Sequence, residues 1–161
     1  MSKGKNGSTV QTVEALVTPA LEEMGLRVWD IRFEKEGPDW FLRILIDRDT
    51  PLDFQTCEQA THMINPILDE ADPIQASYYL EVGSPGLGCR LTRESHFQVK
   101  QGSQILAHLI RPDENGNREI RGILKGKQDQ LVLIEQEDGS IYEVQTKQAS
   151  YFKLCDDENL F

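Results

Sequence analysis

The pattern of the chain changes at residues 79–88, which read Tyr-Leu-Glu-Val-Gly-Ser-Pro-Gly-Leu-Gly. The first four residues continue a short strand pattern, and the glycines and proline after them are typical of a turn. Before this stretch the sequence predicts helices and longer strands, and after it short strands between tight turns. We therefore place a boundary between two domains here, with residues 85–93 as the linker.

The part before the boundary predicts an α+β domain over residues 10–84, preceded by a flexible segment at 1–9. Apolar residues at helical spacing predict a helix over 10–24, capped by Ser8. A second helix is expected to begin after Asp53 and to end near Pro66. Strands are expected at 26–34, 40–47 and 78–82, the first two as a hairpin. This order of elements favours two helices packed on a three-stranded sheet.

The part after the boundary predicts a small β-barrel over residues 94–155, followed by a tail at 156–161. A short helix is expected at 94–99. Strands are expected at 104–110, 119–124, 131–135 and 141–144, with turns that include Asn115-Gly116, residues 125–129 and Asp138-Gly139. Short strands at this spacing are typical of a barrel, and about 55 residues limit it to the SH3-like or Sm-like size.

Composition and charge narrow the class of protein. The three cysteines form no Cys-x-x-Cys pair, so reduced thiols are expected. No secretory signal and no run of about 18 apolar residues occurs, so we expect a cytoplasmic chain without a membrane span. The net charge is −10: residues 1–90 hold 8 Lys+Arg and 15 Asp+Glu, and residues 91–161 hold 9 and 12. This balance opposes nucleic-acid binding by the chain as a whole and favours a basic partner.

Several short motifs resemble the ribosome maturation factor RimP family over residues 10–155. The most specific block comprises Leu80, Glu81, Val82, Ser84, Pro85 and Gly86. Weaker matches are Ile46-Asp47, Cys57-Glu58, Leu91-Thr92, His96-Phe97 and Gly122-Ile123-Leu124. The chain departs from the family at Gly83, where a serine is usual, and at Gly88-Cys89-Arg90, where Asp-Arg-Pro is usual. These departures are expected to loosen the hinge. Contacts that the serine, aspartate, arginine and proline side chains make in the family are not expected in this chain.

The resemblance implies a two-domain protein that matures the small (30S) ribosomal subunit without catalysis. It implies an Sm-like carboxy-terminal barrel and binding to a basic small-subunit ribosomal protein or to the pre-30S particle. Contact with 16S ribosomal RNA is a further expectation. We expect a monomer, because the acidic domain would crowd a ring of barrels.

Two groups of charged residues are candidates for contact with the ribosome. The basic group is expected to form a positive rim on the barrel and contains Arg118, Arg121, Lys125 and Lys127. Lysines that protect a strand edge from aggregation would give the same pattern. The acidic group lies at the hairpin turn and before the second helix, and contains Glu34, Glu36, Asp39, Asp47, Asp49 and Asp53. It is either a docking surface for a basic protein or a set of solubilising loops.

No set of residues predicts a catalytic, cofactor or metal site. The glycines of residues 83–88 would let backbone N–H groups approach an anion, but the lysine of a phosphate loop is absent. The Gly-x-x-Gly pattern of a KH domain joins two helices, whereas this loop follows a strand. Two alternatives remain open: a free-standing Sm-like RNA-binding regulatory module, and a small enzyme that uses this loop as an anion cradle.

Overall fold

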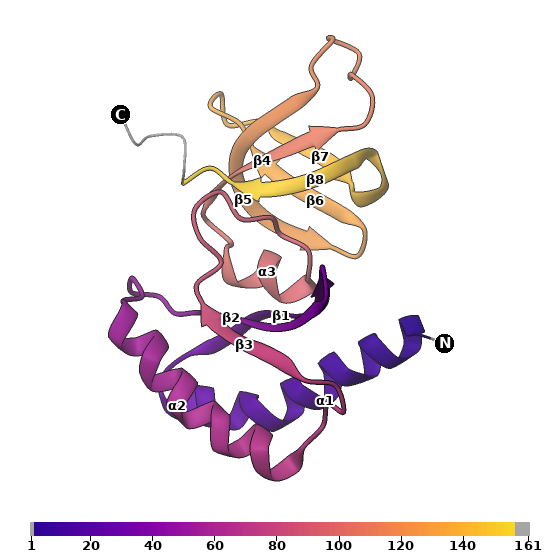
Figure 1. Cartoon of the computed structure of the whole chain (residues 1–161). Coiled ribbons are helices and arrows are strands. Elements are labelled where there is room, and N and C mark those ends of the chain that lie inside the picture. The colour runs from indigo at the N-terminus through magenta and orange to yellow at the C-terminus, as the bar shows by residue number, and fades with distance from the viewer. Residues whose placement is uncertain (1, 157–161) are drawn as a thin grey trace. The chain divides into compact units, whose positions relative to one another are not determined.

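The computed structural model describes residues 2–156 and divides the chain into two compact units between Pro85 and Gly86 (Figure 1). The elements of the first unit are α1 (Ser2–Glu23), β1 (Arg27–Glu36), β2 (Asp39–Asp47), α2 (Phe54–Ala71) and β3 (Tyr78–Gly83). The predicted order of helix, strand, strand, helix and strand is confirmed. The sheet has the order β1-β2-β3; β1 and β2 are antiparallel, and β3 is parallel to β2.

Alternation along β2 decides which face of the sheet the helices cover. Leu42, Ile44 and Ile46 are fully buried, as predicted, and share one core with Leu21 of α1 and Ile64 of α2. Both helices therefore lie on one face of the sheet (Figure 1). The residues between them in β2 point to the opposite face, since successive side chains of a strand alternate. A β-bulge at Trp29 lets both Val28 and Ile31 of β1 contact this core.

Both helices of the first unit are longer than predicted. Helix α1 begins at Ser2, so residues 2–9 form its first turns and not the flexible segment expected. Ser8 lies inside the helix, where its carbonyl accepts a hydrogen bond from the Thr12 hydroxyl (2.9 Å), so the predicted cap is wrong. Once the packed turns are fixed, a helix extends at little cost per residue. Met1 lies outside the described residues.

The prediction that Pro66 ends the second helix is also wrong. Proline removes one helical hydrogen bond, but Ile64 and Leu68 on either side are buried in the core and keep the helix intact. Helix α2 ends at Ala71, where Asp72 adopts the left-handed conformation (φ 48°) and its N–H donates to the Leu68 carbonyl. Its start agrees with the prediction, because the Asp53 carboxylate accepts the N–H of Thr56 (2.8 Å).

The second unit contains a short helix and a five-stranded antiparallel sheet. Its elements are α3 (Glu94–Val99), β4 (Gln104–Leu109), β5 (Glu119–Gln128), β6 (Leu131–Glu135), β7 (Ile141–Gln145), the 3-10 helix η1 (Thr146–Gln148) and β8 (Ala149–Leu154). The strand order is β7-β6-β5-β4-β8. No pairing among the described residues joins β7 to β8, so the sheet is open and the closed Sm-like barrel is not confirmed.

The structure of this unit differs from the prediction at one turn and contains one strand more. The expected turn at 125–129 lies inside β5, which continues through a bulge at Lys125, and the chain turns at Asp129 (φ 54°). Strand β8 was not predicted. It follows β7 after only the three residues of η1, and it is held by antiparallel pairing to β4, which local periodicity does not reveal.

Part of the expected linker belongs to the second unit. The N–H of Leu91 donates to the Phe152 carbonyl (2.8 Å), and the N–H of Leu154 donates to the Cys89 carbonyl (3.0 Å). Between them, Arg90 forms an antiparallel bridge with Lys153. The segment 89–91 thus extends the sheet beyond β8, because the open edge of that strand offers unpaired backbone groups. Of the predicted tail, residues 157–161 lie outside the described part of the chain.

Candidate functional site

The face of the β1–β2–β3 sheet that α1 and α2 do not cover gathers charged and aromatic side chains. Pairing places Glu34, Phe41 and Tyr79 in one cross-strand row and Arg32, Arg43 and Glu81 in the next. We call this surface the acidic face. It is defined by Asp30, Arg32, Glu34, Glu36, Phe41, Arg43, Tyr79 and Glu81.

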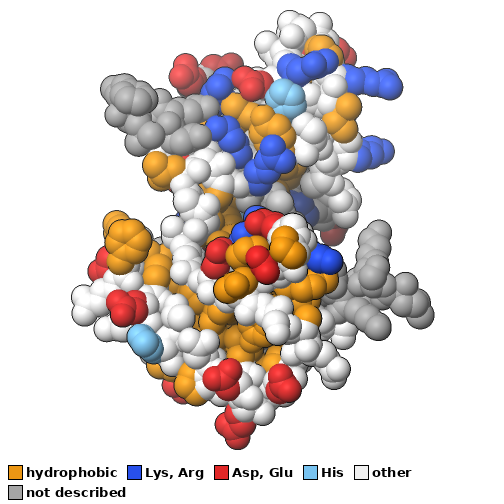
Figure 2. Space-filling model, in the orientation of Figure 1, with side chains coloured by type: hydrophobic (Ala, Val, Ile, Leu, Met, Phe, Trp, Pro, Cys, Tyr) orange, Lys and Arg blue, Asp and Glu red, His pale blue; other side chains and the backbone are white. Residues whose placement is uncertain are grey.

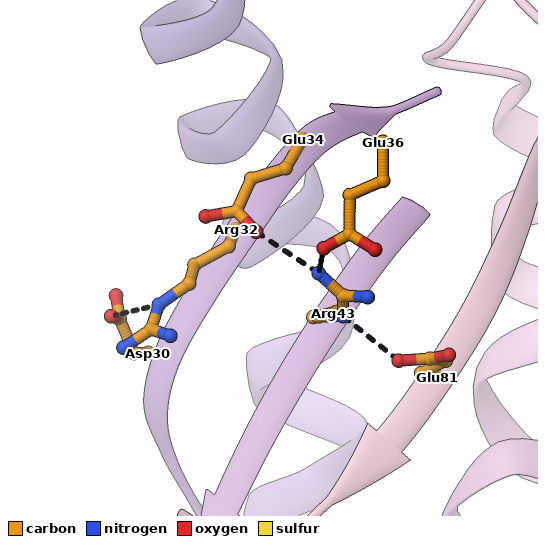
Figure 3. Close-up of polar contacts among 6 residues, drawn as sticks. All are labelled: Asp30, Arg32, Glu34, Glu36, Arg43 and Glu81. Carbon is orange, nitrogen blue, oxygen red and sulfur yellow. Dashed lines mark hydrogen bonds and ion pairs between the residues drawn. The ribbon is translucent and has the colours of Figure 1, made fainter. Parts of the chain in front are cut away.

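Arg43 lies at the centre of the acidic face and binds three glutamates (Figure 3). Its Nη1 donates to Glu34 Oε2 at 3.0 Å and to Glu36 Oε1 at 2.6 Å, and its Nε donates to Glu81 Oε1 at 2.9 Å. The three carboxylates come from two different strands, and the guanidinium between them fixes their positions. One positive charge among three negative charges leaves this cluster with a net negative charge.

The carboxylates of the cluster retain binding capacity beside Arg43. The hydrogen bond from Arg43 lowers the pKa of Glu36 below its usual range, and the hydrogen bond to Glu36 raises the pKa of Arg43. Each glutamate uses one oxygen for Arg43. Within the described residues, the other oxygen of Glu34, Glu36 and Glu81 makes no hydrogen bond. A carboxylate has about four lone-pair sites, so each remains able to accept from a partner's cation.

Aromatic rings lie beside this cluster. The rings of Phe41 and Tyr79 are 5.6 Å apart, and Arg43 Cζ lies 4.8 Å from the centroid of the Phe41 ring. Tyr79 is 59% exposed although its neighbours in the strand pack toward the core. An exposed ring such as Tyr79 next to carboxylates suits lysine and arginine side chains, which are attracted both to the carboxylate charge and to the face of an aromatic ring.

The other predicted acidic residues have different surroundings. Asp47 and Asp49 both bind Arg27, at 2.9 Å each, and Asp53 caps α2. These three form local structure and do not join the acidic face. Asp39 lies exposed beside the hairpin turn and makes no side-chain hydrogen bond or ion pair within the described chain.

The four predicted cations do not form one rim. Arg118 is exposed, Arg121 lies 3.5 Å from Glu119, and Lys125 lies 3.2 Å from Glu135. Lys127 is only 10% exposed. Its ammonium contacts Glu94 at 2.6 Å and lies 5.7 Å from the Phe97 ring centroid, so it attaches α3 to β5. The bulge at Lys125 explains the separation, since it turns the residues beyond it to the other face of β5.

The motif residues of the family resemblance are mainly structural. Leu80 and Val82 of β3 pack against the core, and Glu81 is the residue that contributes to the acidic face. Ser84 and Pro85 lead out of the first unit, and Gly86 takes a positive φ of 82°. In the second unit His96 Nδ1 accepts the N–H groups of Thr92 and Arg93, at 2.9 and 3.1 Å, and so begins α3.

In the glycine-rich loop of residues 83–88, one backbone N–H group already donates a hydrogen bond within the chain. The N–H of Gly88, which an anion cradle would need, donates to Asp156 Oδ1 at 2.7 Å. The residues that the structure describes hold no group of three His, Cys, Asp or Glu side chains placed to bind a metal ion. No helix within residues 2–156 is long and apolar enough to cross a membrane.

Only part of the acidic face is predicted from the sequence. Glu34 and Glu36 are predicted candidates, and Glu81 is a motif residue without a predicted partner. Arg43, Phe41 and Tyr79 are not among the predicted residues. The alternation of β2 offered a signal for Phe41 and Arg43, which lie between buried positions, whereas the contact with Glu81 depends on the parallel pairing of β2 and β3.

A comparison with known families supports the resemblance over the first unit. Residues 16–88 match the model of the RimP N-terminal domain. The matched segment contains all three strands of the first sheet, and with them every residue of the acidic face.

Proposed function

We propose that this chain is a non-catalytic maturation factor of the 30S ribosomal subunit in the cytoplasm. It carries a RimP N-terminal domain and therefore belongs to the RimP family. The first unit would hold a basic small-subunit ribosomal protein on its acidic face. The second unit, taken as the Sm-like module, would contact that protein or nearby 16S ribosomal RNA. The chain would act as a monomer and without a cofactor.

The acidic face is the observation that carries this proposal. Three glutamates with unused oxygens surround Arg43, and two aromatic rings lie beside them. Ribosomal proteins are rich in lysine and arginine, and a segment of that composition matches both the charge and the rings. The overall charge of −10 adds long-range attraction, which raises the rate of encounter and weakens as salt increases.

A binding protein of this kind promotes maturation by preferring one state of its partner. If it binds the immature subunit more tightly than the finished one, it shifts the population toward conformations that can mature, and it is released when the subunit is complete. No chemical step is needed. The second unit would contribute a contact of its own. Arg121 and Lys125 of β5, and Arg118 directly before it, are the exposed cations that would make this contact.

Sedimentation tests this function. Lysate from cells that carry a tagged chain is centrifuged through a sucrose gradient at low and at moderate salt. We expect the chain to migrate with free small subunits, to be absent from translating ribosomes, and to dissociate partly at moderate salt. A chain that stays at the top of the gradient at both salts would contradict the proposal. Binding to protein-free RNA in that case would favour the alternative of a free-standing RNA-binding module.

A further inference from the structure

The sheet of the second unit places three cations in one cross-strand row. Arg121 of β5 is paired with Leu106 of β4, Leu106 with Lys153 of β8, and Lys153 with Arg90 of the segment beyond β8. Paired residues of neighbouring strands project to the same face of a sheet. The row therefore brings together residues that are 63 positions apart in the sequence, from Arg90 to Lys153.

The next row of the same face holds a stack of planar groups. Glu119, His108 and Tyr151 are paired across β5, β4 and β8. The rings of His108 and Tyr151 are parallel, with centroids 5.0 Å apart and an angle of 3° between their planes. The guanidinium of Arg90 lies 4.3 Å from the Tyr151 centroid. Arg90 is exposed and forms no ion pair within the described chain.

This face is positively charged in an otherwise acidic protein. Glu119 lies beside its row of three cations, 3.5 Å from Arg121 and 3.6 Å from His108. Figure 2 shows Lys and Arg side chains and a histidine gathered over β4 and β8 of this unit. We call it the basic stack face, defined by Arg90, His108, Arg121, Tyr151 and Lys153; Leu106, between Arg121 and Lys153 in the row, is buried.

We propose that the basic stack face binds single-stranded RNA. Unpaired bases stack on aromatic rings and on arginine guanidinium planes. Tyr151 lies between its two neighbours, His108 of β4 and Arg90 of the segment beyond β8, so a base would extend this stack on the outer plane of the exposed Arg90 guanidinium. The cation row would follow the phosphates. Neighbouring strands lie about 4.8 Å apart, so three strand spacings carry the row across about 14 Å, the length of a short stretch of single strand. The carboxylates of an acidic protein would pair with the cations but would not stack on the planar groups.

The RNA site deepens the proposed function, on which it rests, by giving the RNA contact of the second unit a surface that includes Arg121. It is separate from the acidic face. It lies in the second unit, whereas the acidic face lies in the first. Arg90 stands where the RimP family usually has a proline, so the stack is a property of this chain. Loss of RNA binding would leave docking of a basic protein intact, and the two experiments can fail independently.

Fluorescence anisotropy of the full chain with a labelled single-stranded RNA of about 12 nucleotides, within the site size of small RNA-binding domains, tests this inference. We expect Tyr151→Ala to weaken binding about 10-fold and Tyr151→Phe, which keeps the ring, to bind within about twofold of the wild type. Arg90→Ala should weaken binding and reduce the slope of log affinity against log salt by about 0.7, the value for one phosphate contact in a single strand. Arg111→Ala, which removes an exposed cation of the same unit away from this face, should change neither.

Four results would overturn the inference, three of them from the binding curves. These three are the absence of salt-dependent binding by the wild type, an equal loss in Arg111→Ala, and tighter binding of a duplex of the same sequence. Competition by polyglutamate as strong as that by RNA would also overturn it, in favour of an acidic protein as the partner. Circular dichroism checks that Tyr151→Ala is folded; if it is not, Arg90→Ala at the exposed edge decides the outcome.

Discussion

Replacing Gly122 with alanine is expected to lower the melting temperature of the second unit by about 10–20 °C, which corresponds to about 2–3 kcal/mol for a domain of this size. A Cβ atom at this position would lie 2.3 Å from the backbone oxygen of Glu135 and 2.6 Å from Ile134 Cγ2. The first of these atoms belongs to the backbone of β6, so strands β5 and β6 would have to separate to make room. The measurement is thermal unfolding followed by circular dichroism.

The matched control is Gly83→Ala. Gly83 is also a strand glycine, but a Cβ atom there would have no neighbour within 4 Å, and its φ does not require glycine. This substitution is expected to be neutral or to stabilise the chain slightly, because alanine reduces the freedom of the unfolded state. The same reasoning predicts that the serine usual in the RimP family would be tolerated at Gly83. Equal melting of Gly122→Ala and Gly83→Ala would contradict the packing of β5 against β6.

The second large effect is expected on the acidic face. The triple substitution Glu34→Gln, Glu36→Gln and Glu81→Gln should weaken binding to purified free small subunits about 10- to 100-fold at low salt. Glutamine keeps an oxygen that accepts from Arg43, so the cluster can hold its geometry while its negative charge is lost. Binding is measured by anisotropy of the labelled chain at two salt concentrations, and the difference between the variants should shrink at the higher salt.

A control with the same change of charge separates a surface effect from a general one. Glu22→Gln, Glu23→Gln and Glu70→Gln remove three exposed charges from α1 and α2, on the opposite side of the first sheet. This variant should bind the subunit within about threefold of the wild type, because its substitutions lie outside the docking surface. A similar loss in both triple variants would show that net charge, and not the acidic face, attracts the partner.

The elements that could be predicted are those whose sequence signal lies within or next to the element itself. The alternation of Leu42, Ile44 and Ile46 identified β2 and its buried face, and Asp53 marked the start of α2. Helix α3 and strand β6 have the predicted bounds. In each case the periodicity or the cap lies within a few residues in the sequence, so it could be found without knowledge of the tertiary fold.

Features that depend on long-range pairing could not be predicted. The contact of Arg43 with Glu81 joins residues 38 positions apart, and it exists because β3 pairs in parallel with β2. The stack of Arg90 on Tyr151 depends on the pairing of the segment 89–91 with β8. Charge composition alone pointed to an acidic first half, but it did not distinguish the glutamates around Arg43 from Asp47 and Asp49, which bind Arg27.

Site-specific photocrosslinking in growing cells tests the docking of a basic ribosomal protein most directly. A benzoylphenylalanine replaces Tyr79, which is 59% exposed on the acidic face, or Phe54, which is 95% exposed at the start of α2. We expect position 79 to crosslink to a basic protein of the small subunit and position 54 not to do so. No crosslink from position 79 to such a protein, or the same product from position 54, would contradict it.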